Sequence, residues 1–194
     1  DESCVRPFLS AGTWPRISPT ACPRHGKTSY GNTPMQLHLP DVDATLQLGV
    51  QMATAISQSL KTPPYPALLL MGGLGSGKTT LVRALVEALP GGDQAEVSSP
   101  SFNLVNIYPT TPQVAHFDFY RLGEGCGDEE LFDEVTPSSH LLTMEWAEYL
   151  IPELWPEDHI KVTWRPCNAG RDVAITPHGP RAGLFLEHLA AFPG

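Results

Sequence analysis

The chain has 194 residues, of which 41% are hydrophobic, enough for one compact domain with a sizeable core. Its 21 acidic residues outnumber its 12 basic ones, and the resulting net charge of −9 excludes a global positive field that would hold nucleic acid directly. The four scattered cysteines indicate neither a zinc site nor a disulfide framework, and no apolar run reaches the roughly 18 residues of a membrane span. These features predict a soluble, cytoplasmic protein with no membrane partner.

Residues 1–34 mix proline, serine, threonine and glycine with four basic residues and show no sustained periodicity. We predict that they form a disordered N-terminal extension and that residues 35–194 form a single domain. Trp14 and the basic residues of the extension leave a binding element as the alternative interpretation.

The ordered part is expected to begin with a helix and a buried strand. Asp41 is a plausible N-cap, and apolar residues three to four apart from Val42 to Leu60 predict a helix of about five turns. Three prolines follow, and the segment "ALLLM", residues 67–71, then reads as a strand that is buried on both faces. A glycine-rich loop separates this strand from a second helix, "KTTLVRALVEAL", which closes at Pro90.

The second half of the chain alternates extended and helical segments. "FNLVNIY" and "QVAHFDFY" predict an antiparallel hairpin around "PTTP", and "DEELFDEV" predicts a short acidic helix. "HLLTMEW" is expected to be a buried strand, "DHIKVTW" and "RDVAIT" a final strand pair, and residues 181–190 a C-terminal helix. Strands that alternate with helices indicate an α/β domain.

The loop before the second helix carries the clearest chemical signal. Its sequence "GGLGSGKT", residues 72–79, satisfies G-x-x-x-x-G-K-[ST] between a strand and a helix, as a phosphate-binding loop requires. Backbone N–H groups and the helix N-terminus would hold phosphates, Lys78 would reach the β- and γ-phosphates, and Thr79 would ligate Mg²⁺. We therefore predict a P-loop NTPase-type three-layer α/β domain with a mostly parallel sheet, an inserted antiparallel hairpin and antiparallel edge strands.

Two carboxylates are candidates for the rest of the site. Glu145 ends an apolar strand, where a second acidic group normally lies near the metal; a surface carboxylate is the alternative. Asp118 lies between aromatic residues in "HFDFYR" and requires a cation, a metal or a hydrogen-bond donor; a salt bridge to Arg121 is the alternative. Because Asp118 is on the inserted hairpin, we expect it to be able to move with the nucleotide state.

A hydroxyl-bearing loop precedes the hairpin. "SSPSF", residues 98–102, is a plausible sensor of the metal and the γ-phosphate, with an ordinary loop as the alternative. His116 and His140 are interpreted as core or strand-end histidines without a catalytic role.

Six segments occur in the order and at the spacing of the bacterial TsaE family, which this sequence resembles from about Met35 onward: "LPDVDATLQLG", "GGLGSGKTT", "SPSF", "HFDFYRL", "MEW" and "GRDVAI". The resemblance implies a small P-loop ATPase that binds ATP and Mg²⁺ and docks on the TsaB and TsaD proteins. There it would support threonylcarbamoyl transfer to N6 of adenosine 37 in tRNA, which it would reach only through the complex.

The motif and the resemblance together define a set of site residues. The catalytic candidates are Lys78, Asp118 and Glu145, and the metal candidates are Thr79 and Glu145. The nucleotide-binding candidates are Thr45, Gly72, Gly73, Leu74, Gly75, Ser76, Gly77, Lys78, Thr79, Thr80 and Arg171, of which Thr45 and Arg171 are implied by the resemblance alone. The chain departs from the family pattern at Gly73, where aspartate is usual, and at Ser101, where threonine is usual.

Two other functions share these features. A small-molecule P-loop kinase would need additional cations from an arginine-bearing lid, and the basic residues after Arg83 form no arginine cluster. An ATP-dependent assembly module with negligible intrinsic turnover would carry the same loop. No N-K-x-D segment indicates guanine recognition, so ATP is favoured over GTP.

Overall fold

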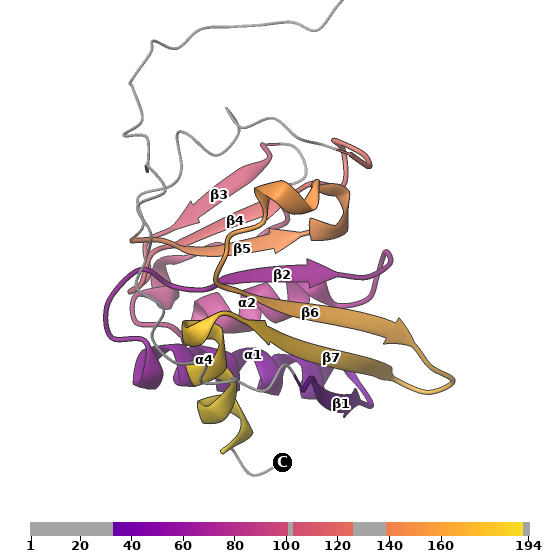
Figure 1. Cartoon of the computed structure of the whole chain (residues 1–194), viewed down its shortest axis with the longest axis horizontal. Coiled ribbons are helices and arrows are strands. Elements are labelled where there is room, and N and C mark those ends of the chain that lie inside the picture. The colour runs from indigo at the N-terminus through magenta and orange to yellow at the C-terminus, as the bar shows by residue number, and fades with distance from the viewer. Residues whose placement is uncertain (1–32, 101–102, 126–138, 192–194) are drawn as a thin grey trace, which may run out of the picture.

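A computed structural model of the chain describes residues 33–100, 103–125 and 139–191 (Figure 1). Residues 1–32 of the predicted N-terminal extension, the predicted acidic helix and Ser101 fall outside these ranges. The described strands form one seven-stranded sheet in the order β1-β7-β6-β2-β5-β4-β3. Their bounds are Met35–Leu39 (β1), Ala67–Met71 (β2), Val105–Tyr108 (β3), Val114–Asp118 (β4), Leu141–Glu145 (β5), His159–Pro166 (β6) and Arg171–His178 (β7).

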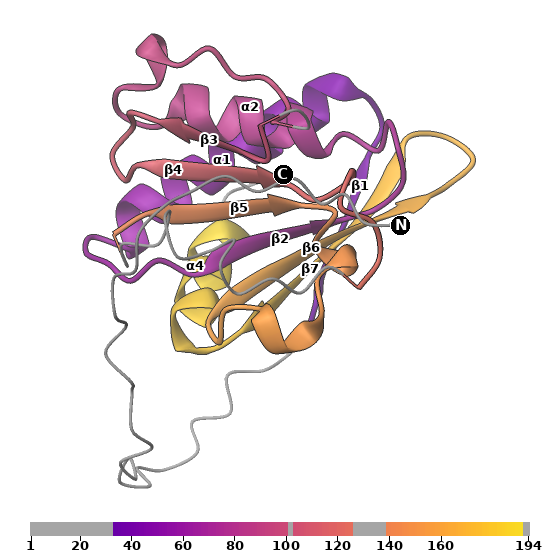
Figure 2. The same ribbon diagram turned by 90° about the horizontal axis from the view of Figure 1, so that it is seen from above.

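The centre of the sheet is parallel and its edges are antiparallel. β2 pairs in parallel with β5 and β6, and β4 pairs in parallel with β5. β7 is antiparallel to β6 and to β1, and β3 is antiparallel to β4. The C-terminal ends of β2, β4, β5 and β6 therefore meet at one edge of the sheet (Figures 1 and 2). This arrangement confirms the predicted P-loop NTPase-like α/β fold.

The two faces of the sheet are covered differently in the described part of the chain. The helices α1 (Val42–Ser59), α2 (Lys78–Ala88) and α4 (Pro180–Ala190) contribute to the larger core cluster, together with Leu68 and Leu70 of β2. Ala67 and Leu69 belong to a second cluster, which includes residues of the short 3₁₀ segment η2 (Ala147–Tyr149). A further 3₁₀ segment, η3 (Pro152–Leu154), follows η2 along the chain. Burial on both faces explains why β2 is a continuous apolar run. None of the helices in the described ranges is both long and apolar enough to cross a bilayer.

The first helix begins where the sequence predicts. The Asp41 side chain accepts a hydrogen bond of 2.8 Å from the Ala44 N–H, so it caps one of the free donors of the first turn. Gly49 then allows α1 and α2 to approach closely: a Cβ added there would lie 2.6 Å from the Ala84 Cβ and 2.8 Å from the Leu81 carbonyl oxygen. This contact fixes α2, and with it the loop that precedes α2, against α1.

The strand β1 was not predicted from the sequence. It is short, and its residues are alternately half-buried and exposed before Leu39 becomes buried, as expected at a sheet edge. It pairs with β7 from Met35↔Ile175 to Leu39↔Arg171, and the two strands lie side by side in Figure 1. The alternation of apolar and polar residues in "MQLHL" was the signal that identifies it.

The predicted hairpin is present as β3 and β4, and the movement of Asp118 with the nucleotide state stays a prediction. β4 pairs with β5 along its whole length, from Val114↔Leu141 to Asp118↔Glu145. It is therefore an integral strand of the parallel sheet, and Asp118 is held at the same level as Glu145.

We predict that Gly49→Ala destabilises the protein, because the added methyl group overlaps α2 atoms that belong to a packed core. Overpacking of this kind costs about 1–3 kcal/mol of unfolding free energy. Val50→Ala, a substitution on the exposed side of α1, is the matched control and should change stability by no more than about 0.5 kcal/mol. Chemical denaturation measures both, and equal stability of the Gly49→Ala variant and the parent would contradict the close approach of the two helices.

Candidate functional site

A pocket of about 440 Å³ opens at the C-terminal edge of the central strands. This volume lies in the usual range of small-molecule sites. It is lined by residues 74–80 of the loop and helix α2, by Ser99, Asp118, Glu145 and Trp146, and by Val42, Thr45, Tyr120, Arg121 and Arg171. The site residues predicted from the sequence thus come together in one pocket, except that Gly72 and Gly73 do not line it.

The glycine-rich loop has a backbone that needs its glycines. Gly72, Gly75 and Gly77 have φ angles of 147°, 71° and 110°, which L-amino acids with a side chain rarely adopt. A Cβ at Gly72 would also lie 2.9 Å from the Cβ of Trp164. Gly73 differs, because a Cβ there would meet nothing within 4 Å. There is therefore space at position 73 for the aspartate that is usual in the family.

Lys78 is the first residue of α2 and is only 4% exposed. Its Nζ donates hydrogen bonds to the carbonyl oxygens of Gly72 and Gly73, at 2.5 and 3.0 Å. Burial lowers the pKa of the Lys78 ammonium, and the nearby negative charges, first that of Glu145, partly oppose this effect. A buried ammonium group next to an open pocket would be stabilised by an anionic ligand, which is the property that phosphate binding requires.

Glu145 is buried at the end of β5, with 3% of its surface exposed, so the alternative of a surface carboxylate is wrong. Its Oε2 accepts a hydrogen bond of 3.0 Å from the Thr79 hydroxyl, and its Oε1 lies 2.9 Å from Nε2 of His116. Both predicted metal ligands thus lie in direct contact. Hydroxyl and carboxylate oxygens are the ligands that Mg²⁺ prefers.

Asp118 is the neighbour of Glu145 on β4 and is 4% exposed. Its Oδ2 accepts a hydrogen bond of 2.5 Å from the Ser99 hydroxyl, and its Oδ1 accepts one of 3.0 Å from the Tyr120 N–H. These two groups are the donors that a buried carboxylate needs. The contact also places one hydroxyl of the predicted sensor loop in the pocket beside Asp118.

Arg171 and Thr45, which the resemblance implies as nucleotide neighbours, both line the pocket. The Arg171 guanidinium donates a hydrogen bond of 3.3 Å to the Gly75 carbonyl oxygen. Thr45 comes from α1 and is buried next to Gly77. Both positions agree with the implied role, which stays a prediction.

Sequence reasoning missed His116 as part of the site. It is fully buried, as expected for a core histidine, but it contacts Glu145 directly, and its Nδ1 lies 3.4 Å from the Tyr108 hydroxyl oxygen. The Tyr108 hydroxyl in turn donates a hydrogen bond to the Ser98 carbonyl oxygen at 3.1 Å. The periodicity of the strand could have predicted this position. Residues two apart on a strand share a face, so His116 lies on the same face of β4 as Asp118.

Trp146 is a second residue that the sequence analysis left without a role. Its backbone is in the left-handed region with φ of 58°, which is unusual for a bulky residue. The Lys78 Nζ lies 3.8 Å from the centre of its ring, and the ring packs against Tyr120 and Tyr149 at centroid distances of 4.8 and 5.3 Å. Such unusual backbone conformations are concentrated at functional sites, and here the conformation orients the ring over Lys78.

Comparisons with known proteins agree with these features. The sequence model of the family described as threonylcarbamoyl adenosine biosynthesis protein TsaE matches residues 39–173, a range that contains every predicted site residue. The TsaE protein of Streptomyces coelicolor is 37% identical over 99 residues, which are 49% of this chain and 65% of that relative. The proteins of the same name from Synechocystis and Bacillus subtilis are 35% and 31% identical and cover 62% and 66% of the chain and 74% and 79% of the relatives.

A solved structure is similar to the whole fold. The crystal structure of YdiB from Bacillus subtilis has a TM-score of 0.62 and covers 81% of this chain and 95% of its own, with 22% sequence identity. This likeness concerns the fold alone. The match of the family model over residues 39–173, together with the sequence relatives, shows that the chain belongs to the TsaE family.

Proposed function

We propose that this chain is a Mg²⁺-dependent ATPase of tRNA threonylcarbamoyladenosine biosynthesis that acts on a complex of the TsaB and TsaD proteins. Its family membership supports the role in threonylcarbamoyladenosine biosynthesis. The observation that carries the ATPase proposal is the convergence of the glycine-rich loop with two buried carboxylates, Glu145 and Asp118, in one pocket.

The pocket fits a nucleoside triphosphate with its metal ion. Phosphate oxygens would take the place of the Gly72 and Gly73 carbonyl oxygens as acceptors for the Lys78 ammonium. The Thr79 hydroxyl and Glu145, already in contact, would hold Mg²⁺, and the N-terminus of α2 would add its positive end. Thr45 and Arg171, which also line the pocket, would border the rest of the nucleotide.

Some residues of the site would bind the nucleotide and others would activate the attacking water. Bound Mg²⁺ would neutralise the negative charge that develops on the phosphates. Lys78 would orient the terminal phosphate, because its ammonium is restricted by the ring of Trp146. Asp118, held by Ser99 and the Tyr120 N–H, would orient the attacking water through its carboxylate.

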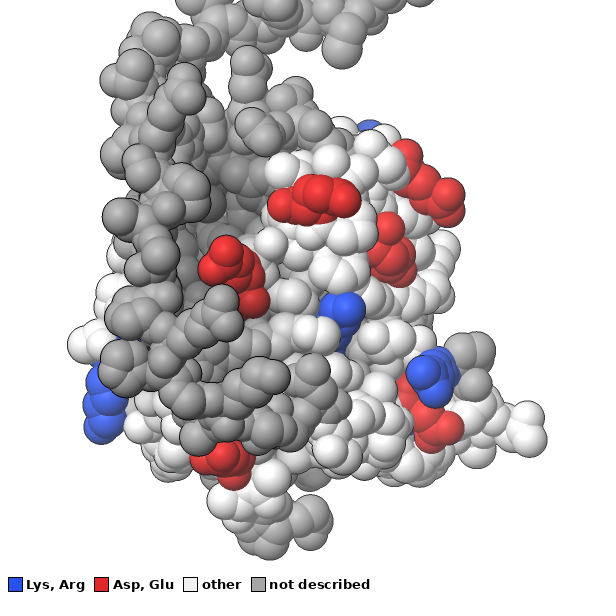
Figure 3. Space-filling view, in the orientation of Figure 1, with Lys and Arg blue, Asp and Glu red and all other residues white. Residues whose placement is uncertain are grey.

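The surface charge favours contact with tRNA through partner proteins. Figure 3 shows acidic and basic side chains scattered over the described part of one face, without a broad basic patch. A net charge of −9 gives no general attraction for the phosphate backbone. We therefore assign tRNA binding to the TsaB–TsaD complex, which the resemblance to the family also implies as the place of threonylcarbamoyl transfer.

Release of phosphate from ATP tests this proposal. The chain should release phosphate slowly with ATP and Mg²⁺, and purified TsaB and TsaD should increase the rate. ATP binding without release in the presence of both partners would instead identify an assembly module. Phosphate transfer that requires a small-molecule acceptor would identify a kinase.

We predict that Lys78→Ala lowers ATP affinity at least tenfold, because it removes a charge-assisted contact worth roughly 1.5–3 kcal/mol. Thr79→Ala should weaken binding mainly in the presence of Mg²⁺, because the hydroxyl serves the metal. Titration calorimetry with and without Mg²⁺ measures both effects. Unchanged affinity of the Lys78→Ala protein would exclude the loop as the phosphate site.

The two carboxylates should differ in role. Glu145→Gln should impair both Mg²⁺-dependent binding and hydrolysis. Asp118→Asn should leave ATP affinity within about threefold but lower partner-stimulated turnover at least tenfold, a loss of about 1.4 kcal/mol of transition-state stabilisation. Full turnover of the Asp118→Asn protein would show that this carboxylate has only a structural role.

His116 should act through Glu145. His116→Phe removes the partner of Oε1, and we expect Mg²⁺-dependent ATP affinity to fall at least fivefold while Mg²⁺-free affinity changes little. His116→Gln keeps a donor and should restore part of the loss, and His188→Gln, on α4, is the control. Equal Mg²⁺ dependence in the His116→Phe protein and the parent would contradict this role.

A further inference from the structure

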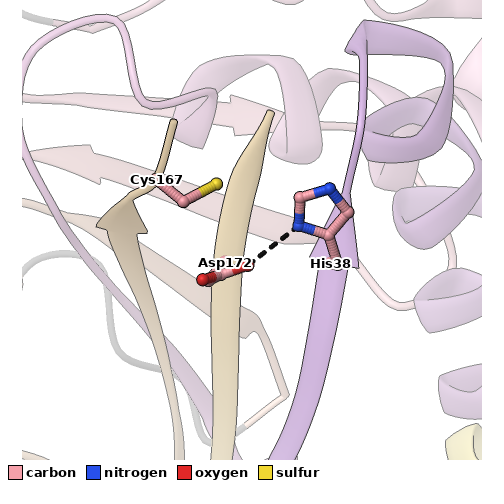
Figure 4. A group of neighbouring side chains, drawn as sticks. All are labelled: His38, Cys167 and Asp172. Atoms are coloured by element: carbon pink, nitrogen blue, oxygen red, sulfur yellow. Dashed lines mark hydrogen bonds and ion pairs between the residues drawn. The ribbon is translucent and has the colours of Figure 1, made fainter. Parts of the chain in front are cut away.

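Three side chains outside the pocket come together at the edge of the sheet formed by β1 and β7 (Figure 4). They are His38 on β1, Asp172 on β7, and Cys167, which follows β6 in the turn that leads to β7. We propose that these three residues form a binding site for a divalent transition-metal cation of the zinc class. The proposal is independent of the nucleotide chemistry proposed above.

The ligand atoms are already close to one another. His38 Nδ1, Cys167 Sγ and a carboxylate oxygen of Asp172 all lie within 4.8 Å of one another, and Nδ1 is 2.9 Å from Asp172 Oδ1. Bonds of about 2.0–2.3 Å in a tetrahedral zinc site correspond to ligand separations of roughly 3.3–3.8 Å. The remaining adjustment is on the order of 1 Å, which half-exposed side chains make by small rotations.

The backbone holds the three positions in place. His38 and Asp172 are register partners on the β1–β7 ladder, so their side chains are direct neighbours on one face. The turn that carries Cys167 packs tightly against the end of β1, since a Cβ at Gly170 would lie 2.4 Å from the Leu39 carbonyl oxygen. Gly170 also has a φ of 75°, a conformation that suits glycine. The site is therefore built on rigid strands and one fixed turn.

The types of donor define the class of metal. An imidazole nitrogen, a thiolate sulfur and a carboxylate oxygen together suit zinc and similar borderline cations, whereas Mg²⁺ and Ca²⁺ prefer oxygen alone. Three protein ligands leave a fourth position for water or for another ligand. Without a metal, His38 and Asp172 form an ion pair, and the Cys167 thiol donates a hydrogen bond of 2.9 Å to the Ala169 carbonyl oxygen; metal binding would replace both contacts.

The sequence analysis gave no reason to expect such a site. Zinc motifs are recognised by cysteines or histidines at short spacing, and here His38 and Asp172 are 134 positions apart. The site exists only because β1 pairs with β7, and β1 was itself missed. Its detection therefore depends on the structure.

Cobalt binding provides a specific test, because a thiolate bound to Co²⁺ gives a charge-transfer absorption that oxygen and nitrogen ligands do not give. The experiment uses the full chain with Cys4, Cys22 and Cys126 replaced by serine, so that Cys167 is the only thiol. We expect a saturable band with one equivalent of Co²⁺, and its loss when Zn²⁺ is added. No band at a tenfold molar excess of Co²⁺ would overturn the proposal.

Variants of the same protein test the other two ligands. His38→Ala and Asp172→Ala should each weaken Co²⁺ binding at least tenfold, and Cys167→Ser should abolish the band. His188→Ala, which removes a histidine of α4, is the control and should leave the titration unchanged. Thermal unfolding without metal checks that each variant is folded. A band of unchanged affinity in both the His38→Ala and the Asp172→Ala proteins would mean that Cys167 binds the metal without them, which would also overturn the proposal.

Discussion

The parallel pairing of β2, β5 and β4 is the constraint on which the candidate site depends. Parallel strands place their C-terminal ends at the same edge of a sheet, so the loop after β2 and the last residues of β5 and β4 must be neighbours. The register places these segments at the same level along the strands, since Leu70 pairs with Glu145, and Glu145 pairs with Asp118. Three segments that are distant in sequence thus form one pocket.

Charged groups inside this pocket are tolerated because each one has partners. Glu145 contacts a hydroxyl and an imidazole, Asp118 accepts two hydrogen bonds, and Lys78 donates to the carbonyl oxygens of the loop. Removing a single partner would leave a buried charge without compensation, which is costly. The network therefore keeps Glu145 and Asp118 side by side at this edge of the sheet.

Local signals in the sequence were sufficient for most of the fold and for the centre of the site. The cap at Asp41, the apolar run of β2 and the pattern from Gly72 to Thr79 each act within a few residues, so they could be read directly. Long-range contacts were the limit. The pairing of β1 with β7, the contact of His116 with Glu145 and the approach of Cys167 to His38 all depend on tertiary structure. The position of β4 within the parallel sheet could not be predicted for the same reason, because a hairpin pattern does not show which other strand pairs with it.

A crystal structure with a non-hydrolysable ATP analogue and Mg²⁺ would show whether this loop and these carboxylates bind ATP with its metal ion. We expect the Lys78 ammonium to leave the carbonyl oxygens of Gly72 and Gly73 and to contact the β- and γ-phosphates. We also expect the metal to lie beside Thr79 and Glu145. An analogue bound elsewhere, with Lys78 still on those carbonyl oxygens, would contradict this proposal.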